Sequence, residues 1–295
     1  MSIWIPLQWL IAVGAGAMVG SFLNVVIHRL PILIGASEEE GGGAGEAARR
    51  LSLSWPSSHC PACRAPIRLR HNVPLLGYVL LGGRCADCRG AISPRYPLVE
   101  AAGAGVAALA LWRFGPTVEA GLVATLLWGL ICVAAIDLRH LLIPDVLSGA
   151  ILWSGLCASA LGWWPLPASD SALGAAFGYS GMYLLAETAA YLIGREAIGG
   201  GDGKLLAGLG AWVGWRAVPL IFFGACLTGT LVVVPLLILG RHRRGDPLPF
   251  GPFLALSGAG IVLLGAGNLS TNELAMSLSM LVNSVIENDI LPFAK

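Results

Sequence analysis

The amino-acid sequence predicts an all-α polytopic membrane protein of about eight transmembrane helices, with a small cysteine-bearing module inserted between helices 1 and 2. Hydrophobic residues make up 56% of its 295 positions and charged residues only 12%, with a mean hydropathy of +0.76. Soluble domains carry roughly 25% charged residues, so most of this chain is predicted to lie in a bilayer. The net charge of +1 excludes a globally basic nucleic-acid-binding protein, and no nucleic-acid partner is expected.

Residues 1–27 are expected to form the first transmembrane helix. The 24 positions from Trp4 to Ile27 carry no charge, and roughly 20 apolar residues suffice to cross the hydrocarbon core. A cleaved signal peptide is the alternative. The apolar run is too long for one, no basic residues precede it, and a basic pair follows it. Gly16 and Gly20 predict a small-residue face on which a second helix packs closely.

Seven further apolar stretches predict the remaining transmembrane helices. They form one membrane-embedded unit over 97–267, and the amphipathic tail at 268–295 is expected to lie on the membrane surface. The sixth of the eight predicted helices is too short to cross a bilayer alone. The stretches are 97–113, 118–136, 143–163, 171–193, 204–215, 217–240 and 250–267.

One sizeable polar segment, 28–96, interrupts the apolar pattern. Residues 35–48 are rich in Glu, Gly and Ala, a composition that indicates a flexible acidic insertion. Residues 55–95 form a compact module that carries four cysteines. Because this module has few large apolar residues, it is expected to need a bound metal in order to fold.

The basic residues predict the orientation of the chain in the membrane. With eight transmembrane helices, the polar segment 28–96 lies on the same side as the loops near 139, 195–204 and 241–249. Fifteen of the eighteen Lys and Arg residues fall on that side, which is therefore predicted to be cytoplasmic. Both termini are expected on the opposite side.

Four cysteines form two C-x2-C pairs that are separated by 21 residues. Cys60 and Cys63 make the first pair, and Cys85 and Cys88 make the second. Four thiolates can surround a zinc ion tetrahedrally at about 2.3 Å per bond, and this spacing is close to that of zinc ribbons. Two disulfides or a redox pair are the alternatives, but cytoplasmic thiols are kept reduced. The sequence therefore predicts a structural Zn²⁺ site in a cytoplasmic module.

Two aspartates, Asp137 and Asp202, are predicted to lie at the cytoplasmic face of the membrane. Charged groups beside the hydrocarbon core are costly and indicate function. Two neighbouring carboxyl groups can share one proton, so that one acts as a base and the other as an acid. Gly199 and Gly201 allow a tight turn before Asp202, and with Lys204 they are expected to support a catalytic loop.

Each acidic residue also has a structural interpretation. Asp137 could pair with a neighbouring basic residue at the interface, and Asp202 could cap a helix. Asp145 follows a proline and is expected to satisfy free N–H groups at the start of a helix. Glu187 lies inside an apolar stretch, where it could hydrogen-bond a neighbouring helix; its role stays open.

Six motifs occur in a fixed order between residues 14 and 256. They are GSFLNVVIHRLP at 20–31, the two cysteine pairs, ISPRYPLVE at 92–100, ID at 136–137 with IPD at 143–145, GGGDGKLL at 199–206 and PFGP at 249–252. In this combination the chain resembles the bifunctional type IV prepilin peptidases, which are membrane aspartic peptidases of the GxGD type.

The resemblance implies a specific activity and location. It implies a bacterial inner-membrane enzyme with both termini periplasmic, which cleaves the short basic leader from type IV prepilins or type II secretion pseudopilins. It also implies N-methylation of the new first residue by S-adenosylmethionine, with the cysteine module tied to the methyltransferase half. Asp137 and Asp202 match the catalytic aspartates. Gly200 and Gly203 depart from the family, which commonly has aromatic residues there.

Three other functions are compatible with parts of the pattern. No stretch is recognisable as an S-adenosylmethionine-binding sequence, so a peptidase without methyltransferase activity is one alternative. An ion- or proton-coupled transporter would explain buried carboxylates, but it is expected to show inverted repeats, which are absent from the sequence. A membrane-anchored zinc-ribbon scaffold would leave the two aspartates on one face unexplained.

Overall fold

The computed structural model describes residues 4–38, 52–55, 57–193, 199–241 and 247–265. These residues are mainly helical, and the only β-structure among them is two isolated bridges. Most of the predicted insertion at 35–48 and all of the predicted membrane-surface tail at 268–295 lie outside the described residues.

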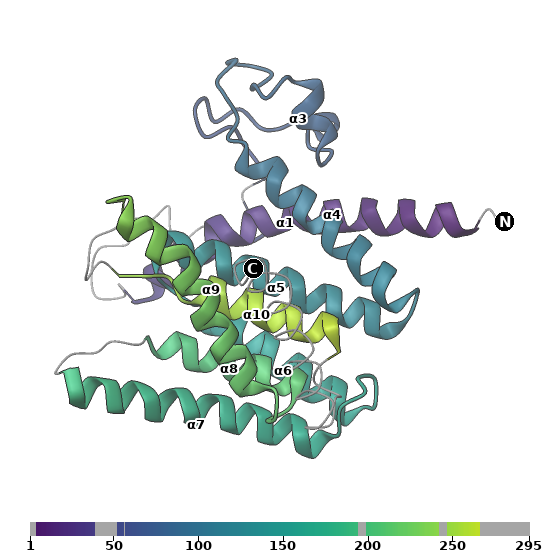
Figure 1. The fold of residues 1–295 in the computed structure, drawn as a ribbon. Coiled ribbons are helices and arrows are strands. Elements are labelled where there is room, and N and C mark those ends of the chain that lie inside the picture. The colour runs from purple at the N-terminus through teal and green to yellow at the C-terminus, as the bar shows by residue number, and fades with distance from the viewer. Residues whose placement is uncertain (1–3, 39–51, 56, 194–198, 242–246, 266–295) are drawn as a thin grey trace, which may run out of the picture.

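Eight helices of at least 14 described residues coincide with the eight predicted apolar stretches, and two short elements lie in the cysteine-bearing segment (Figure 1). The predicted all-α class is therefore confirmed. The long helices are α1 (Trp4–Glu38), α4 (Arg95–Phe114), α5 (Val118–His140), α6 (Asp145–Ala160), α7 (Ala168–Ile193), α8 (Gly200–Val213), α9 (Val218–Ile238) and α10 (Gly251–Leu264); the short elements are η1 (Leu69–His71) and α3 (Leu76–Leu80).

The predicted number of transmembrane helices, about eight, is too high. Among the described residues, four helices are both long and apolar enough to cross a membrane: α1, α4, α5 and α9. The apolar helices α6 and α10 have only 16 and 14 residues. At 1.5 Å per residue they extend roughly 24 and 21 Å, which is less than a hydrocarbon core of about 30 Å.

Glycines allow α1 and α4 to cross at backbone contact. A Cβ at Gly16 would lie 2.6 Å from the carbonyl oxygen of Gly103, and one at Gly20 would lie 2.7 Å from the Cα of Glu100. The predicted small-residue face of α1 is thus confirmed, and its partner is α4. The indole of Trp128 on α5 donates a 3.0 Å hydrogen bond to the Gly103 carbonyl and joins this pair to the rest of the bundle.

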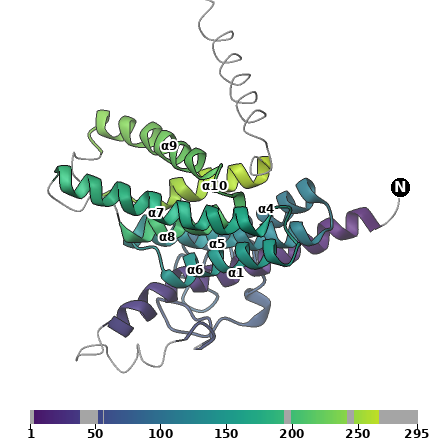
Figure 2. The same ribbon diagram turned by 90° about the horizontal axis from the view of Figure 1, so that it is seen from below.

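The short helix α8 lies in the interior of the bundle. Every residue from 205 to 213 is buried, and α6, α7, α9 and α10 all contact this helix. In both ribbon views α1 and α7 lie on opposite sides of α5 (Figures 1 and 2). Because neighbouring helices surround α8, it does not need the length of a helix that crosses a membrane alone.

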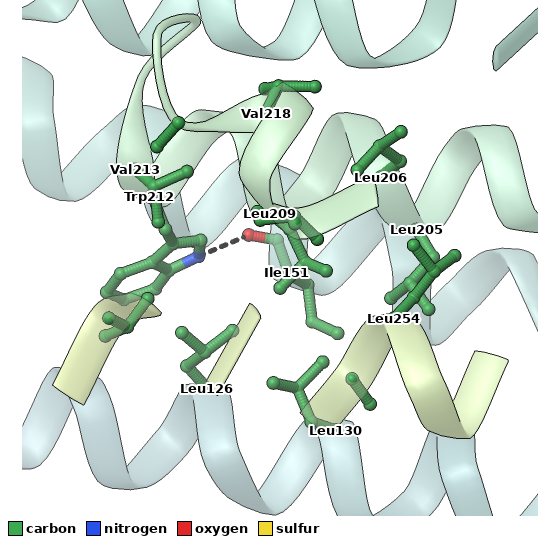
Figure 3. Packing of buried hydrophobic residues seen from close by; sticks show 14 of the residues in the cluster. Leu126, Leu130, Ile151, Leu205, Leu206, Leu209, Trp212, Val213, Val218 and Leu254 are labelled. Carbon is green, nitrogen blue, oxygen red and sulfur yellow. Dashed lines mark hydrogen bonds between the residues drawn. The ribbon is translucent and has the colours of Figure 1, made fainter. Parts of the chain in front are cut away.

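Hydrogen bonds from tryptophan fix the far end of α8. The Trp212 indole donates a 2.9 Å bond to the Ile151 carbonyl on α6, and the Trp164 indole donates a 2.8 Å bond to the Trp212 carbonyl. Figure 3 shows the Trp212 ring directed at Ile151, with Leu126 of α5 nearby. Buried polar groups that are fully paired in this way fix one arrangement of the core. The opposite end of α8, which begins at Gly200, is thereby held in a defined position.

Candidate active site and zinc module

Asp137 lies in the last turn of α5 and is only 5% exposed. The helix ends at His140, because Leu141 adopts a left-handed conformation with φ of 52° and donates its N–H to the Asp137 carbonyl. The carboxylate atom Oδ2 accepts a 2.8 Å hydrogen bond from the backbone N–H of Gly251, at the start of α10. A Cβ at position 251 would lie 2.8 Å from the same oxygen, so glycine allows this close approach.

Asp202 lies in the first turn of α8 and is partly buried. Gly199 is the N-cap residue, and its carbonyl accepts a 3.2 Å hydrogen bond from the Asp202 N–H. Gly201 lies directly against the loop between α5 and α6, since a Cβ there would be 2.9 Å from the Cβ of Ile143. Gly199 therefore closes the turn that carries Asp202, and Gly201 allows that turn to pack closely against Ile143.

The structure brings Asp137 and Asp202 together, although 65 positions separate them in the chain. Their carboxylates are close enough to interact electrostatically. Ile143 lies between the starts of α8 and α10. It contacts Gly201 of α8 on one side, and on the other a Cβ at Gly251 of α10 would be 3.1 Å from its Cδ1. The end of α5 and the starts of α6, α8 and α10 thus converge around two acidic side chains.

Lys204, which was predicted with Gly199 and Gly201 to support the catalytic loop, forms an ion pair with Asp145. Its ammonium Nζ lies 2.7 Å from each carboxylate oxygen, so the first turns of α8 and α6 are joined. The prediction that Asp145 caps α6 is wrong, because the N-cap is Pro144 and no side-chain cap bond is formed. The carboxylate bonds to the ammonium group instead of to free N–H groups.

For two other residues, Glu187 and Gly251, the sequence alone did not predict a role. Glu187 is exposed on α7, away from the buried side of that helix. Gly251 bonds to Asp137, a role that its place in the PFGP motif did not predict. The one signal in the sequence was the PFGP motif at 249–252, in which a glycine and two prolines mark a turn at the start of an apolar stretch.

The two cysteine pairs fold as copies of the same turn. The Cys60 N–H donates 2.9 Å to the Ala65 carbonyl, and the Cys85 N–H donates 2.8 Å to the Gly90 carbonyl. The residue after each second cysteine, an arginine in both copies, has a positive φ of 59°. Each turn also closes with one isolated antiparallel bridge. The repeated turn aims four thiols at one point.

The four thiols fit a zinc ion. All four Sγ atoms lie within 4.8 Å of one another, with Cys60 and Cys88 3.9 Å apart and Cys63 and Cys85 4.0 Å apart. A tetrahedron with Zn–S bonds of about 2.3 Å has edges of about 3.8 Å. Backbone N–H groups of Cys63 and Ala62 lower the pKa of the Cys60 thiol to about 6, whereas burial and the neighbouring thiols raise the pKa of the Cys63 thiol to about 12, so the metal-free cluster favours one thiolate.

A hydrogen bond joins the zinc module to α4, and a second one joins α4 to α1 close by. Glu100 Oε2 accepts a 2.8 Å hydrogen bond from the backbone N–H of Leu75, the N-cap residue of α3, which has a positive φ of 61°. Asn24 on α1 donates from Nδ2 to the carbonyl of Tyr96, in the first turn of α4, at 3.1 Å, and so joins the two helices below the module. Both helix residues lie at the end of the α1–α4 crossing that is nearest the module.

Two family models cover most of the chain. The Bacterial Peptidase A24 N-terminal domain matches residues 15–114, and the Type IV leader peptidase family matches residues 124–234. The first match contains the zinc module with its two supporting helices, and the second contains Asp137 and Asp202. The site thus defines a membrane-embedded peptidase. The chain belongs to the type IV leader peptidase family.

Curated relatives agree with this assignment over nearly their full length. Each of three is named Prepilin leader peptidase/N-methyltransferase. The relative from Pseudomonas aeruginosa is 42% identical over 82% of this chain and 86% of its own length. The relative from Dickeya chrysanthemi is 41% identical over 90% of this chain and 96% of its own length. The relative from Burkholderia pseudomallei strain 1026b is 42% identical over 88% of this chain and 86% of its own length. No solved structure matches the chain. The prediction of a peptidase is confirmed.

Proposed function

We propose that this protein is a membrane aspartic endopeptidase. It removes the short basic leader from type IV prepilins or type II secretion pseudopilins and N-methylates the new first residue. The observation that carries the proposal is the approach of Asp137 to Asp202 at the convergence of four helix ends. Membership of the family, whose curated relatives carry both activities in their names, supports it.

Two neighbouring carboxyl groups can supply both halves of peptide hydrolysis. The ionised carboxylate takes a proton from water while the other, protonated, donates a hydrogen bond to the scissile carbonyl. The water oxygen bonds to the carbonyl carbon, and the C–N bond then breaks as the departing amine gains a proton. Gly251 fixes the orientation of Asp137, and the α8 backbone positions Asp202. Gly199, Gly201 and Lys204 support that position.

The proposed orientation rests on the distribution of basic residues along the sequence and on the nature of the substrate. In this proposal residues 97–267 form the membrane-embedded peptidase, and the loop 28–96 carries the four-cysteine module. The two aspartates and the module both face the cytoplasm. The protein is placed in a bacterial inner membrane with both termini periplasmic. A prepilin has a basic cytoplasmic leader followed by an apolar membrane helix. Cleavage between them requires carboxylates at the cytoplasmic interface.

The methyl-transfer half involves S-adenosylmethionine as the methyl donor. When bound, the donor would supply the methyl group of its sulfonium to the new α-amine, which would give up a proton. The four-cysteine site is proposed to hold Zn²⁺ in a structural role, because all four ligand positions are taken by thiolates. A peptidase without methyltransferase activity is the remaining alternative for this chain.

One experiment tests both activities. The purified full-length protein is incubated in detergent with a prepilin and S-adenosylmethionine, and the products are followed by mass spectrometry. The expected product has lost the leader and gained one methyl group on its first residue. Leader removal without methylation would support the alternative, and an intact prepilin would contradict the peptidase assignment.

A further inference from the structure

A cavity of about 430 Å³ lies between the zinc module and the crossing of α1 and α4. Its volume falls within the roughly 300–1,000 Å³ typical of small-molecule sites. The two cysteine turns form one wall, α3 forms a second, and α1 and α4 form the floor. The cavity is separate from the carboxylate pair, since neither Asp137 nor Asp202 lines it.

The cavity lining combines charges of both signs with aromatic rings. The lining includes two carboxylates and two guanidinium groups, together with tyrosine rings: Glu100 and Asp87, Arg29 and Arg68, and Tyr78 and Tyr96. A ligand that suits this lining carries positive charge, a carboxylate, and a planar ring that can stack on an aromatic side chain. S-adenosylmethionine has all three: a sulfonium and an ammonium, a carboxylate, and an adenine base.

Glu100 gives the floor of the cavity its negative charge. It is partly buried, and the Leu75 N–H donates to one of its oxygens. One neutral donor does not cancel the charge of a carboxylate, and neither of the two salt bridges found among the described residues includes Glu100. A half-buried carboxylate of this kind attracts a cationic ligand more strongly than one in open solvent.

The cavity lies next to the helix that packs against the peptidase site. Asn24 and His28 on α1 line the cavity. On the same stretch of α1, Ile27 belongs to a buried cluster with Ile136, the neighbour of Asp137 on α5. Only the thickness of α1, about 10 Å, therefore separates the cavity floor from the end of α5 that carries the carboxylate.

We propose that this cavity is the binding site for S-adenosylmethionine, with the Glu100 carboxylate facing the cationic methionine part of the donor. The inference rests on the proposed methyltransferase function and adds the location of its cofactor. It also gives the zinc ion a defined role: the metal holds together the two cysteine turns that form one wall of the cavity. Methyl transfer and cleavage then occur on two sides of α1.

Binding of the donor to Glu100→Gln tests the role of the charge. The amide oxygen of Gln can still accept the Leu75 N–H, so the substitution removes charge and keeps the contact. The full-length, zinc-loaded protein in detergent is titrated with S-adenosylmethionine by calorimetry. We expect the Kd to rise about tenfold, the effect of losing one charge-assisted contact. The matched control Glu119→Gln, at the start of α5, should bind like the unaltered protein.

Zinc content and the rate of leader removal show whether Glu100→Gln keeps its fold, and both should equal those of the unaltered protein. A second measurement locates the donor directly. Methyl-labelled S-adenosylmethionine is cross-linked to the unaltered protein with ultraviolet light, and the labelled peptides are identified. We expect the labelled peptides to contain residues from 21–29 or 58–100, the two ranges that line the cavity. An unchanged Kd in a zinc-loaded variant, or label confined to α5–α10, overturns the assignment. If Glu100→Gln loses zinc, the label map decides alone.

These outcomes distinguish a failure of the proposed binding site from a failure of the proposed methyltransferase function. A protein that methylates processed pilin but takes up label elsewhere disproves the cavity and leaves the function standing. Label in the cavity without any methylation supports the site and contradicts the methyltransferase activity. A protein that neither binds the donor nor methylates contradicts both.

Discussion

The helix α8 and the zinc module position functional groups by opposite means. Residues 205–213 of α8 are buried among four other helices, and apolar packing fixes the first turn that carries Asp202. In the module most side chains are exposed, and Cys60 and Cys85 are buried where the thiols meet. Packing distributes the stabilisation over many contacts, whereas a metal site concentrates it in four ligands. Single substitutions should therefore affect the two regions differently.

The connection between the two regions is narrow. The module rests on α1 and α4, and the carboxylate pair rests on α5, α6, α8 and α10. Polar contacts such as Leu75 to Glu100 hold the module to its helices, while buried apolar residues join α1 to α5. Damage to the module is thus expected to spare the peptidase helices.

The largest effect is expected at the carboxylates. Asp137→Asn and Asp202→Asn each remove a group that serves as acid or base, which typically costs about 10²–10⁴-fold in rate. Leader removal by the purified variants should fall by at least that factor, as measured by mass spectrometry of the pilin product. Folding should be retained, because Asn preserves shape and, at 137, an oxygen that accepts the Gly251 N–H.

Asp145→Asn is the matched control for these two substitutions. It also removes a carboxylate at the same helix convergence, but its side chain is 70% exposed and bonded to Lys204. It should retain measurable activity. Full leader removal by Asp202→Asn, with Asp145→Asn inactive, would mean that the chemistry has been assigned to the wrong pair.

The next effect is confined to the module. Cys60→Ser leaves three ligands, so zinc should be lost and residues 57–95 should become sensitive to limited proteolysis. Metal analysis and peptide mapping measure these changes. Methylation should fall by more than about tenfold while leader removal changes less than about threefold, since zinc-dependent folding is local to the module. Cys157→Ser, which alters an exposed cysteine on α6, is the control and should keep its zinc.

Zinc-free protein with an intact, protease-resistant module would contradict the metal assignment. Equal loss of both activities in Cys60→Ser would contradict the separation of the two regions.

A smaller, graded effect is expected at the α1–α4 crossing. Gly16→Ala places a methyl group 2.6 Å from the Gly103 carbonyl, so the helices must move apart; overpacking typically costs roughly 1–3 kcal/mol. The same change at Gly14 meets nothing within 4 Å and gains the same helix propensity. Thermal unfolding in detergent should show a lower Tm for Gly16→Ala than for Gly14→Ala. Methylation should decline more than cleavage, because these helices form the cavity floor.

The sequence predicted features that depend on local pattern. Apolar runs located all eight long helices, the spacing of Cys60, Cys63, Cys85 and Cys88 predicted the metal cluster, and Gly16 and Gly20 predicted a helix contact. In each case a short-range rule, such as helical period or ligand spacing, decides the outcome.

Features that depend on packing between distant segments were missed. Gly251 bonds to Asp137 across 114 positions, and Lys204 binds Asp145 across 59. No local pattern indicates which backbone N–H meets a given carboxylate. The number of transmembrane helices was overestimated for a related reason, because helices such as α8 are apolar through burial among other helices and not through contact with lipid.

The smallest effect is expected at the Lys204–Asp145 pair, which joins α8 to α6 at the carboxylate end. Both side chains are well exposed, at 43% and 70%, and exposed pairs typically contribute about 0.2–1 kcal/mol. A double-mutant cycle with Lys204→Met and Asp145→Asn, followed by thermal unfolding, should therefore give a coupling energy within that range, and it should shrink as salt is added. The rate of leader removal should change by less than about fivefold in either single variant, because packing of residues 205–213 holds α8 in place without the ion pair. A coupling energy several times larger, or loss of cleavage in Lys204→Met with its fold intact, would mean that the first turn of α8 depends on this surface contact. The distinction between a region fixed by packing and a region fixed by a few bonds would then no longer hold at the active site.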